Sequence, residues 1–184
     1  MSLSKKSKEE LNENEFLSRG RYDSDSKAYW NWAIKRFGDS KDALNAILHC
    51  GGTLEYNIYM DFIQKRALSK FIKKSNGKDV LDVGCGVGRW SLLFAGSGAR
   101  VIGIDFSDEM LKVAERNAKL SGCKCKFLKM NVVNLDFSDD SFDLVNCAIV
   151  LMHIKNNEDF KKSLQEMIRV TKPGGILLLS KSPL

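Results

Sequence analysis

A short apolar run that leads directly into three glycines is the feature that most restricts how this 184-residue chain can fold. Residues 79–83 read Asp-Val-Leu-Asp-Val, and glycines follow at positions 84, 86 and 88. A strand buried on both faces has this near-continuous apolar character, and glycines permit a tight turn that other residues rarely adopt. A helical pattern begins at Trp90, so free backbone N–H groups would point out of the turn. The run predicts a strand, a turn that binds the anionic end of a ligand, and a helix.

Strand-like and helix-like patterns alternate along the rest of the chain. Further strands are predicted at residues 101–104, 125–130, 142–149 and 176–180, and helices at 90–94, 107–122 and 158–170. Ser107 is expected to cap the second of these helices, with Asp108 and Glu109 favoured in its first turn by the helix dipole. Strands that alternate with helices form a parallel sheet with helices on its faces. The predicted fold class is therefore α/β, with an open, doubly wound, mainly parallel sheet.

The first 77 residues have a different pattern. Residues 1–20 are polar and charged, and they are predicted to be a flexible tail. Residues 21–77 are expected to form a helical appendage or lid, with helices at 29–37, at 42–48 and from about 58 to 76. One face of the last helix is predicted to carry its apolar residues, which are Ile58, Tyr59, Phe62, Ile63, Ala67 and Phe71. The sheet domain would then occupy residues 78–184.

The spacing of the glycines distinguishes two kinds of nucleotide-binding protein. A nicotinamide dinucleotide fingerprint has the pattern G-x-G-x-x-G. Here the third glycine, Gly88, comes one position early, and Arg89 stands where that glycine is expected. The spacing therefore argues against a dehydrogenase.

Three motifs, in this order, resemble those of class I S-adenosylmethionine (SAM)-dependent methyltransferases. They are the D-x-G-x-G-x-G sequence of residues 82–88, Asp105 at the end of the next strand, and the Pro-Gly-Gly of residues 173–175. The resemblance covers roughly residues 78–180. It implies a Rossmann-like methyltransferase fold and a methyltransferase that uses SAM to modify an unidentified small-molecule acceptor.

The resemblance also implies which residues bind the cofactor. The glycine turn would hold the methionyl part of SAM, and Asp82 would reach its ammonium group directly or through water. Asp105 would accept both ribose hydroxyls, because a carboxylate has two acceptor oxygens. Met110 would pack against adenine, and Asn131, where the family usually has Asp, would contact the adenine edge through a neutral acceptor. The implied cofactor-binding residues are Asp82, Gly84, Cys85, Gly86, Gly88, Asp105, Phe106, Met110, Asn131 and Val132.

His153 is the candidate catalytic residue. It follows the fourth predicted strand, where the resemblance implies a histidine beside the transferred methyl group. An imidazole with a pKa near neutrality can take a proton from an acceptor hydroxyl or amine. A loop histidine bonded to the backbone is the other interpretation. The rival candidates for substrate contact are Tyr22, Tyr29, Trp30 and Arg89.

Incomplete motifs argue against a metal site and a nucleic-acid site. Cys123 and Cys125 would lie on one face of a strand, but only the chain's two histidines could complete a metal site, so no metal is predicted. Cys147 lacks the preceding proline of enzymes that attack cytosine. Asn146 does not begin the Asn-Pro-Pro-aromatic sequence of enzymes that methylate base amino groups. A net charge of +6 favours nucleic acid only weakly, so a nucleic-acid partner is not predicted.

Apolar runs and cysteines give an expectation for the cellular compartment. No run is long enough for a signal peptide core or a membrane span. The five cysteines include no C-x-x-C pair, and their number is odd. A cytoplasmic protein without a membrane partner is expected.

The end of the chain gives a last expectation. The family's sheet continues past its fifth strand with a helix and an antiparallel hairpin, so this sheet is predicted to be truncated after residues 176–180. An exposed strand edge is a liability, and a second copy of the chain or the N-terminal segment is expected to mask it. Two alternatives to a small-molecule enzyme stay open: a non-catalytic SAM-binding domain or fragment, and an RNA or protein methyltransferase.

Overall fold

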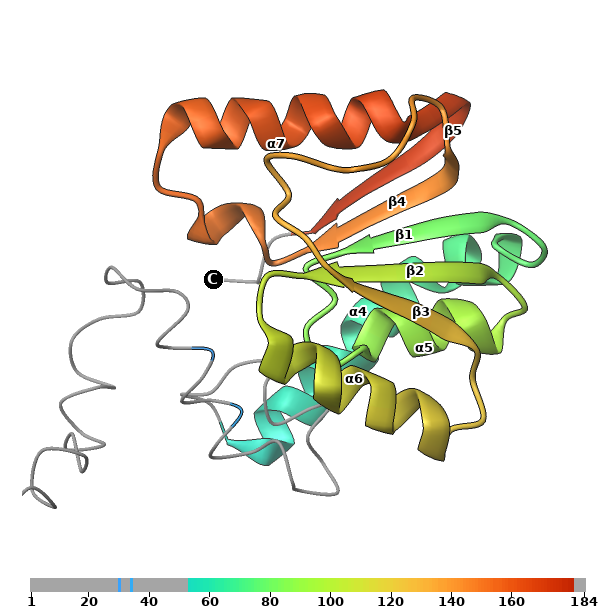
Figure 1. Ribbon diagram of the computed structural model, residues 1–184. Coiled ribbons are helices and arrows are strands. Elements are labelled where there is room, and N and C mark those ends of the chain that lie inside the picture. The colour runs from blue at the N-terminus through green and yellow to red at the C-terminus, as the bar shows by residue number, and fades with distance from the viewer. Residues whose placement is uncertain (1–29, 31–33, 35–52, 181–184) are drawn as a thin grey trace, which may run out of the picture.

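The structure is a computed structural model that describes Trp30, Ile34 and residues 53–180. Its centre is a five-stranded parallel sheet in the order β3-β2-β1-β4-β5 (Figure 1). The strands are β1 (Asp79–Val83), β2 (Arg100–Asp105), β3 (Cys125–Lys129), β4 (Phe142–Ala148) and β5 (Thr171–Ser180). The helices are α4 (Leu54–Lys74), α5 (Arg89–Gly96), α6 (Asp108–Leu120), the short 3-10 helix η2 (Leu151–His153) and α7 (Asn157–Val170). The strand order reverses between β1 and β4, which is where open α/β sheets bind ligands.

Helices cover both faces of the sheet. Helix α7 lies over one face, and α4, α5 and α6 lie over the other (Figure 1). Successive residues of β1 alternate between the two layers, because Leu81 and Val83 belong to the cluster under α7 and Val80 belongs to the cluster shared with α4 and α5. Strand β1 is therefore buried on both faces, as its near-continuous apolar sequence predicts.

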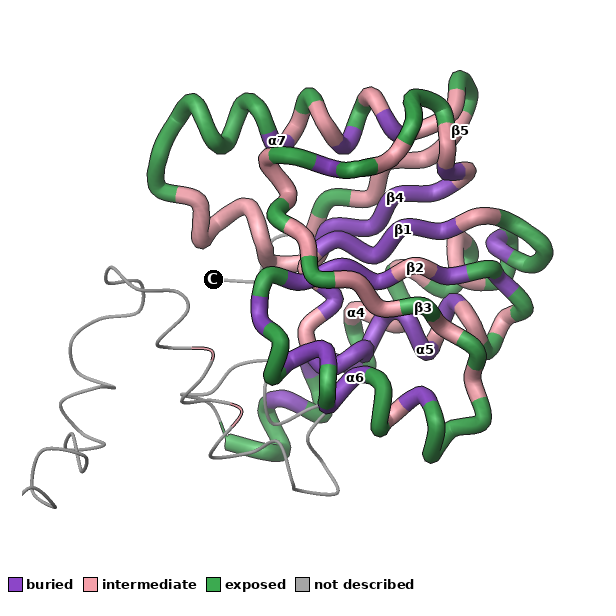
Figure 2. The backbone as a smooth tube through the Cα atoms, viewed as in Figure 1, coloured by how far each residue is buried: buried purple, intermediate pink, exposed green. Residues whose placement is uncertain are grey.

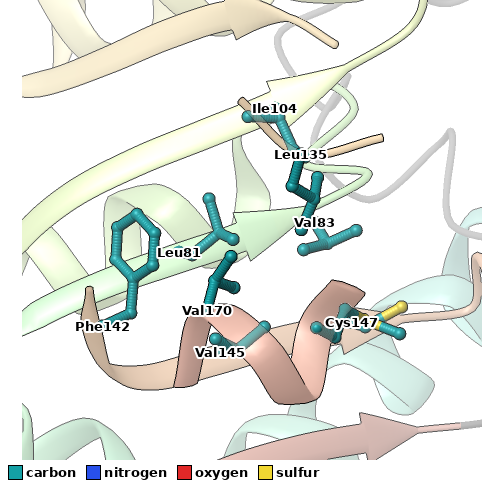
Figure 3. Close-up of a cluster of buried hydrophobic side chains, with 9 residues drawn as sticks. Leu81, Val83, Ile104, Leu135, Phe142, Val145, Cys147 and Val170 are labelled. Atoms are coloured by element: carbon teal, nitrogen blue, oxygen red, sulfur yellow. The ribbon is translucent and has the colours of Figure 1, made fainter. Parts of the chain in front are cut away.

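The cluster under α7 holds the middle of the sheet together (Figure 3). The backbone of β1 and β4 is mostly buried, whereas β3 and β5 at the two edges are more open (Figure 2). Burying one aliphatic side chain contributes roughly 1.5–3 kcal/mol. The cluster therefore fixes the carboxyl ends of β1, β2 and β4 relative to one another. Its buried members are Leu81, Val83, Ile104, Leu135, Phe142, Val145, Cys147, Met167 and Val170.

The α/β class and the five predicted strands are confirmed, and the strand boundaries agree to within one residue except at the start of β5. Strand β4 ends at Ala148 instead of Ile149, because Ile149 has a φ of +69° and turns the chain out of the sheet. Strand β5 begins at Thr171, earlier than predicted. The reason is that Pro173–Gly175 lies within the strand as an irregularity in its pairing with β4, not as a turn before it.

Helix α4 departs most from its sequence prediction. The sequence predicts one apolar face that includes Ile58, Tyr59, Phe62 and Phe71. Phe71 packs against the core cluster shared with α5, but the other three side chains are 48%, 60% and 58% exposed. Asp61 pairs instead with Arg89 of α5, and both side chains are buried. A buried ion pair is stable only when its partners stay together, so the side of the helix that carries Asp61 at its start and Leu68 and Phe71 further along turns inward. The buried residues of α4 are Asn57, Met60 and Asp61.

Most of the first 52 residues lie outside the described part of the chain. The exceptions, Trp30 and Ile34, have helical backbone and pack against a buried group formed by Val87, Met110 and Val113. The predicted tail at 1–20, the predicted helix at 42–48 and the rest of the appendage up to residue 52 are not described.

Candidate active site

The loop of residues 84–88, between β1 and α5, borders the candidate site. Its three glycines have left-handed backbone angles, with φ of +66° at Gly84, +52° at Gly86 and +88° at Gly88. The N–H of Cys85 donates to the carbonyl of Ile104 in β2 at 2.9 Å, which holds the loop against the sheet. Residues with a Cβ rarely adopt such angles. The turn therefore depends on glycine at these positions.

The three glycines have different surroundings. A Cβ at Gly84 would lie 2.1 Å from Cγ2 of Val150, and one at Gly88 would lie 3.3 Å from a side chain of α6. A Cβ at Gly86 would meet only Sδ of Met110, at 3.9 Å. Gly84 and Gly88 thus let other parts of the protein pack against the loop, whereas Gly86 leaves open space at the site.

Asp105 ends β2 beside the loop, and each of its carboxylate oxygens accepts a backbone hydrogen bond. Oδ2 accepts from the N–H of Gly86 at 3.0 Å, and Oδ1 accepts from the N–H of Ser107 at 2.9 Å. The side chain is 8% exposed, and this burial raises the pKa of Asp105 although the backbone donors oppose the shift. A carboxylate offers about four lone-pair sites, so Asp105 is oriented by its backbone donors and keeps acceptor capacity for a ligand.

The start of α6 lies next to Asp105 and provides an apolar surface. Ser107 caps this helix as the sequence predicts, because its Oγ accepts from the N–H of Met110 at 3.3 Å. Met110 is 2% exposed, and Phe106 is 37% exposed. Both border the same cavity as the glycine loop. Their apolar side chains suit a flat, apolar part of a ligand.

The segment after β3 continues this wall. Asn131 and Val132 line the cavity, as predicted for cofactor-binding residues. The Oδ1 of Asn131 accepts from the N–H of Val133 at 3.2 Å. Part of its acceptor capacity therefore stabilises the local turn, and a second lone pair stays available to a ligand.

The opposite wall follows the end of β4. His153 in η2 has its ring edge-on to Trp30, with 5.4 Å between centroids and 76° between planes. Burial lowers the pKa of His153 from its usual 6.5, so the imidazole is neutral at pH 7. Ile149 borders the cavity with its φ of +69°, an angle that costs energy in a β-branched residue. Strained residues of this kind concentrate at functional sites.

Two of the residues predicted to bind the cofactor, Gly88 and Asp82, do not line the cavity. Asp82 is 1% exposed and accepts from Oγ of Ser91 at 2.6 Å and from Nδ2 of Asn146 at 2.8 Å. Burial raises the pKa of Asp82 to about 6, and the bonds from Ser91 and Asn146 oppose this shift. Asp82 therefore ties β1 to α5 and β4, and its role at the SAM ammonium group stays a prediction.

Arg89 lines the cavity, but much of its guanidinium group is bound to α4. Nη1 donates to Oδ1 of Asp61 at 3.0 Å, and Nη2 donates to Oε1 of Gln64 at 2.8 Å. The guanidinium carbon also lies 4.4 Å from the ring centroid of Trp90. Arg89 therefore connects α4 to the first turn of α5, directly after the glycine loop.

All these elements border one cavity of about 430 Å³, within the usual range of small-molecule sites of roughly 300–1,000 Å³. Eight of the ten predicted cofactor-binding residues line it, and so do His153, Trp30 and Arg89. The structure thus brings together residues that are separated by up to 123 positions, from 30 to 153. Among the lining residues that the sequence prediction missed are Trp90, Ala148 and Asp159. Trp90 follows the glycine turn, Ala148 ends β4, and Asp159 lies in the first turn of α7. These positions were the only available signals.

Other predicted candidates do not enter the site. Tyr22 and Tyr29 lie outside the described residues. Within residues 53–180, together with Trp30 and Ile34, no group of three or more His, Cys, Asp and Glu side chains is placed to hold a metal ion.

A parallel sheet with a glycine loop after β1 and an acid at the end of β2, both bordering one cavity, is the arrangement of class I SAM-dependent methyltransferases. SAM is the cofactor of this class. Residues 80–175 match the model of the methyltransferase domain family, which is just over half of the chain. The chain therefore belongs to this family.

Curated relatives agree with the family. The chain is 43% identical over 104 residues to a demethylmenaquinone methyltransferase of Geobacillus stearothermophilus, a match that covers 54% of the chain and 43% of the relative. It is 33% identical over 144 residues to a demethylmenaquinone methyltransferase of Thermus thermophilus, which covers 77% of the chain and 60% of the relative. The chain thus spans about half the length of these relatives.

Solved structures agree with the fold. A SAM-dependent methyltransferase from Methanosarcina mazei is 33% identical with a TM-score of 0.54, covering 57% of this chain and 52% of that one. A protein from Pyrococcus horikoshii is 24% identical with a TM-score of 0.65, covering 84% of this chain and 66% of that one, and supports the fold alone.

Proposed function

We propose that this chain transfers the methyl group of SAM to a small-molecule acceptor. The observation that carries the proposal is that two different walls face one cavity. The glycine loop and Asp105 form one wall, and His153 with Trp30 forms the other. A site that only bound the cofactor would need the first wall alone. The second wall provides a place for an acceptor and a base next to it.

The first wall fits the parts of SAM in order along its length. We assign the methionyl end to the glycine loop, including Cys85, where Gly86 leaves open space. The ribose hydroxyls fit the free lone pairs of Asp105, and adenine fits the apolar surface of Met110 with Phe106. The adenine edge lies nearest Asn131 and Val132 in this assignment. Gly88 acts from outside the cavity through its left-handed backbone angle, which completes the turn, and Asp82 ties the strand before the loop to α5 and β4.

The residues of the second wall need to do little chemistry. SAM supplies a methyl group on a sulfonium sulfur, which is already an excellent leaving group. The protein then contributes in-line positioning of the acceptor and exclusion of water. Trp30 and Val150 serve the exclusion of water, since both are apolar and border the cavity. His153 is neutral at pH 7 and can take the acceptor's proton at a ring nitrogen.

The acceptor class that this wall fits is a small molecule with an apolar body. The wall is built from Trp30, Ala148, Ile149, Val150 and Ile154, with polar groups at His153 and Asp159. The curated relatives are named for demethylmenaquinone. Demethylmenaquinone is therefore the first acceptor to test.

Calorimetry and a turnover assay test the proposal. SAM is titrated into the protein, with nicotinamide dinucleotide as the comparison ligand, and release of S-adenosylhomocysteine is then measured with demethylmenaquinone and with small hydroxylated and aminated aromatic compounds. We expect SAM binding, no dinucleotide binding, and acceptor-dependent release. Dinucleotide binding without SAM binding would overturn the cofactor assignment. SAM binding without turnover on any acceptor would identify a non-catalytic SAM-binding domain, and turnover only on RNA or protein would replace the acceptor class.

We further propose that the protein acts in the cytoplasm, which is supported by the free thiols of the four described cysteines, Cys85, Cys123, Cys125 and Cys147. No helix in the described part of the chain has the length and apolar character to cross a bilayer.

We also propose that a second copy of the chain pairs with β5. Within the described sheet, β5 pairs with β4 alone and presents main-chain groups on its other side. Light scattering of the purified protein tests it.

A further inference from the structure

The inner face of helix α4 contacts the rest of the protein along its length. Asp61 and Gln64 hold the guanidinium group of Arg89. One to two turns later, Leu68, Phe71 and Ile72 pack against the core cluster shared with α5. This face fixes the rotation of the helix about its own axis. The side chains on the opposite face are therefore held outward.

The opposite face carries large apolar side chains at its start. Ile58, Tyr59 and Phe62 are 48%, 60% and 58% exposed, and Leu54 and Ile63 beside them are 40% and 38% exposed. Residues 54, 58 and 62 follow one another at i, i+4 spacing, so they form one stripe. Other strongly exposed apolar residues, such as Leu120 on α6 and Ile168 on α7, lie on separate helices. A contiguous apolar stripe of this kind marks an interaction surface.

Basic residues continue the same stripe toward the end of the helix. Arg66 and Lys70 follow Phe62 at the same spacing, and Lys73 and Lys74 lie in the last turn. All four are exposed. The acidic residues of α4 are Glu55, in the first turn, and Asp61, which is buried against Arg89. The outer face is therefore apolar and aromatic at one end and positively charged at the other.

The start of α4 lies at the same end of the molecule as the cavity. In Figure 1, the helix begins on the side toward which the arrowheads of the strands point, and the cavity is built at those strand ends. The hydrogen bonds from Arg89, which lines the cavity, to Asp61 and Gln64 connect the two regions directly. A surface bound by the stripe would thus lie close to the cavity.

We propose that the outer face of α4 docks on the surface of an anionic lipid bilayer. An exposed helix with aromatic and aliphatic side chains and neighbouring basic residues fits the boundary between acyl chains and anionic headgroups. The basic end complements the negative headgroups, and the apolar end enters the boundary layer. This contact is separate from a membrane span and differs from the sequence expectation of no membrane partner. It does not depend on the proposed methyl transfer, but it would bring the cavity to a source of apolar acceptors.

Vesicle sedimentation tests the proposal with the full chain. The probes are vesicles of phosphatidylcholine alone and of phosphatidylcholine with increasing phosphatidylglycerol. We expect binding that rises with phosphatidylglycerol and falls with salt. Tyr59→Ser/Phe62→Ser should weaken binding about 10-fold or more. The matched control, Leu120→Ser/Ile168→Ser, removes two apolar side chains from other helices that are at least as exposed, at 79% and 62%, and should bind as the unchanged protein does.

A charge pair gives a second, independent readout. Arg66→Gln/Lys70→Gln should weaken binding by roughly fivefold per charge removed, while Lys112→Gln/Lys119→Gln on α6 should have much less effect. These residues are exposed, so all the variants should keep the melting temperature and SAM affinity of the unchanged protein. Absence of binding by the unchanged protein, or equal losses in test and control variants, would overturn the proposal. A dimer in lipid-free solution that Tyr59→Ser/Phe62→Ser dissociates would assign the surface to a second copy instead.

Discussion

The two walls of the cavity are built in different ways. On the first wall, which we propose binds the cofactor (the cofactor wall), Met110 and Asp105 are 2% and 8% exposed, and Asp105 accepts a backbone hydrogen bond from the loop. On the second wall, which we propose faces the acceptor (the acceptor wall), Trp30 and His153 are only half-buried and their rings make a T-shaped contact. The first wall is held in one arrangement by hydrogen bonds to the backbone. The second wall consists of side-chain packing that can vary without disturbing the sheet.

The largest effect is expected from a substitution in the glycine loop of the cofactor wall. Gly84→Ala forces a Cβ to within 2.1 Å of Val150 at a φ of +66°, and should lower the free energy of unfolding by about 3 kcal/mol or more. Gly86→Ala has only the backbone strain, about 1–2 kcal/mol, and should mainly lower SAM affinity. Denaturant unfolding and SAM titration of both variants separate the two effects. Equal destabilisation by both would show that the packing difference between these glycines has no consequence.

Asp105→Ala tests the same wall from the ligand side. Removing the carboxylate should weaken SAM binding by roughly 2–4 kcal/mol, because two charge-assisted hydrogen bonds are lost. It also leaves the N–H groups of Gly86 and Ser107 without their acceptor, so the unfolding free energy should fall as well. Asp105→Glu keeps the charge and should lose much less affinity. Unchanged SAM affinity in the Ala variant would make Asp105 a purely structural residue.

The pH dependence of the unfolding free energy tests the role of Asp82, which lies behind the cofactor wall. Its pKa is about 6 in the folded chain against 3.8 for the ordinary group, so the folded state holds the proton to higher pH than the unfolded state. The stability that this proton provides is present below about pH 4 and is lost as the pH rises to about 6. At 1.36 kcal/mol per pKa unit, the loss is on the order of 3 kcal/mol. Urea unfolding between pH 4 and pH 7 should show this decline in the unchanged protein.

The matched variant for this test is Asp82→Asn, which cannot ionise. Its unfolding free energy should decline less over the same pH range, and the remaining decline would include the contribution of Asp105, whose pKa burial also raises. Parallel pH profiles for the two proteins would contradict the assignment of the shift to Asp82.

The smallest effect on binding is expected on the acceptor wall. His153→Ala should lower kcat by about 100-fold while leaving SAM affinity nearly unchanged, because a base acts on the acceptor and not on the cofactor. In the unchanged protein, kcat should fall only below about pH 6.5, because burial lowers the pKa of His153 from that value. Full turnover by the variant would leave positioning as the only function of this wall.

The cofactor wall was predictable because its signals are local. The glycines, Asp105 and the Ser107 cap each follow directly from a short run of sequence, and the structure places eight of the ten predicted residues on the cavity. Asp82 was a harder case, since its partners Ser91 and Asn146 are 9 and 64 positions away. Nothing in the motif itself shows that these groups, and not the cavity, surround the carboxylate.

The acceptor wall and α4 depend on contacts between distant residues. Trp30 meets His153 across 123 positions, and no periodic pattern connects them. The apolar residues of α4 predict one face, but the pairing of Asp61 with Arg89 fixes a rotation that leaves Tyr59 and Phe62 exposed. The left-handed angle of Ile149 was also not predictable, because β-branched residues rarely adopt it. The sequence therefore predicts the cofactor, which the family shares, more clearly than the acceptor, which distinguishes its members.

The burial of Asp105 has a calorimetric consequence. Its pKa is raised in the free protein, and hydrogen-bond donors from a bound ribose favour the ionised carboxylate and lower that pKa again. Binding of SAM should therefore release protons to the buffer wherever the free carboxyl is partly protonated, and affinity should rise with pH across that range. The observed heat of binding would then contain the heat of buffer protonation. Titrations in acetate and in MES at one mildly acidic pH should give different apparent enthalpies, and the Asp105→Ala variant should show a smaller difference.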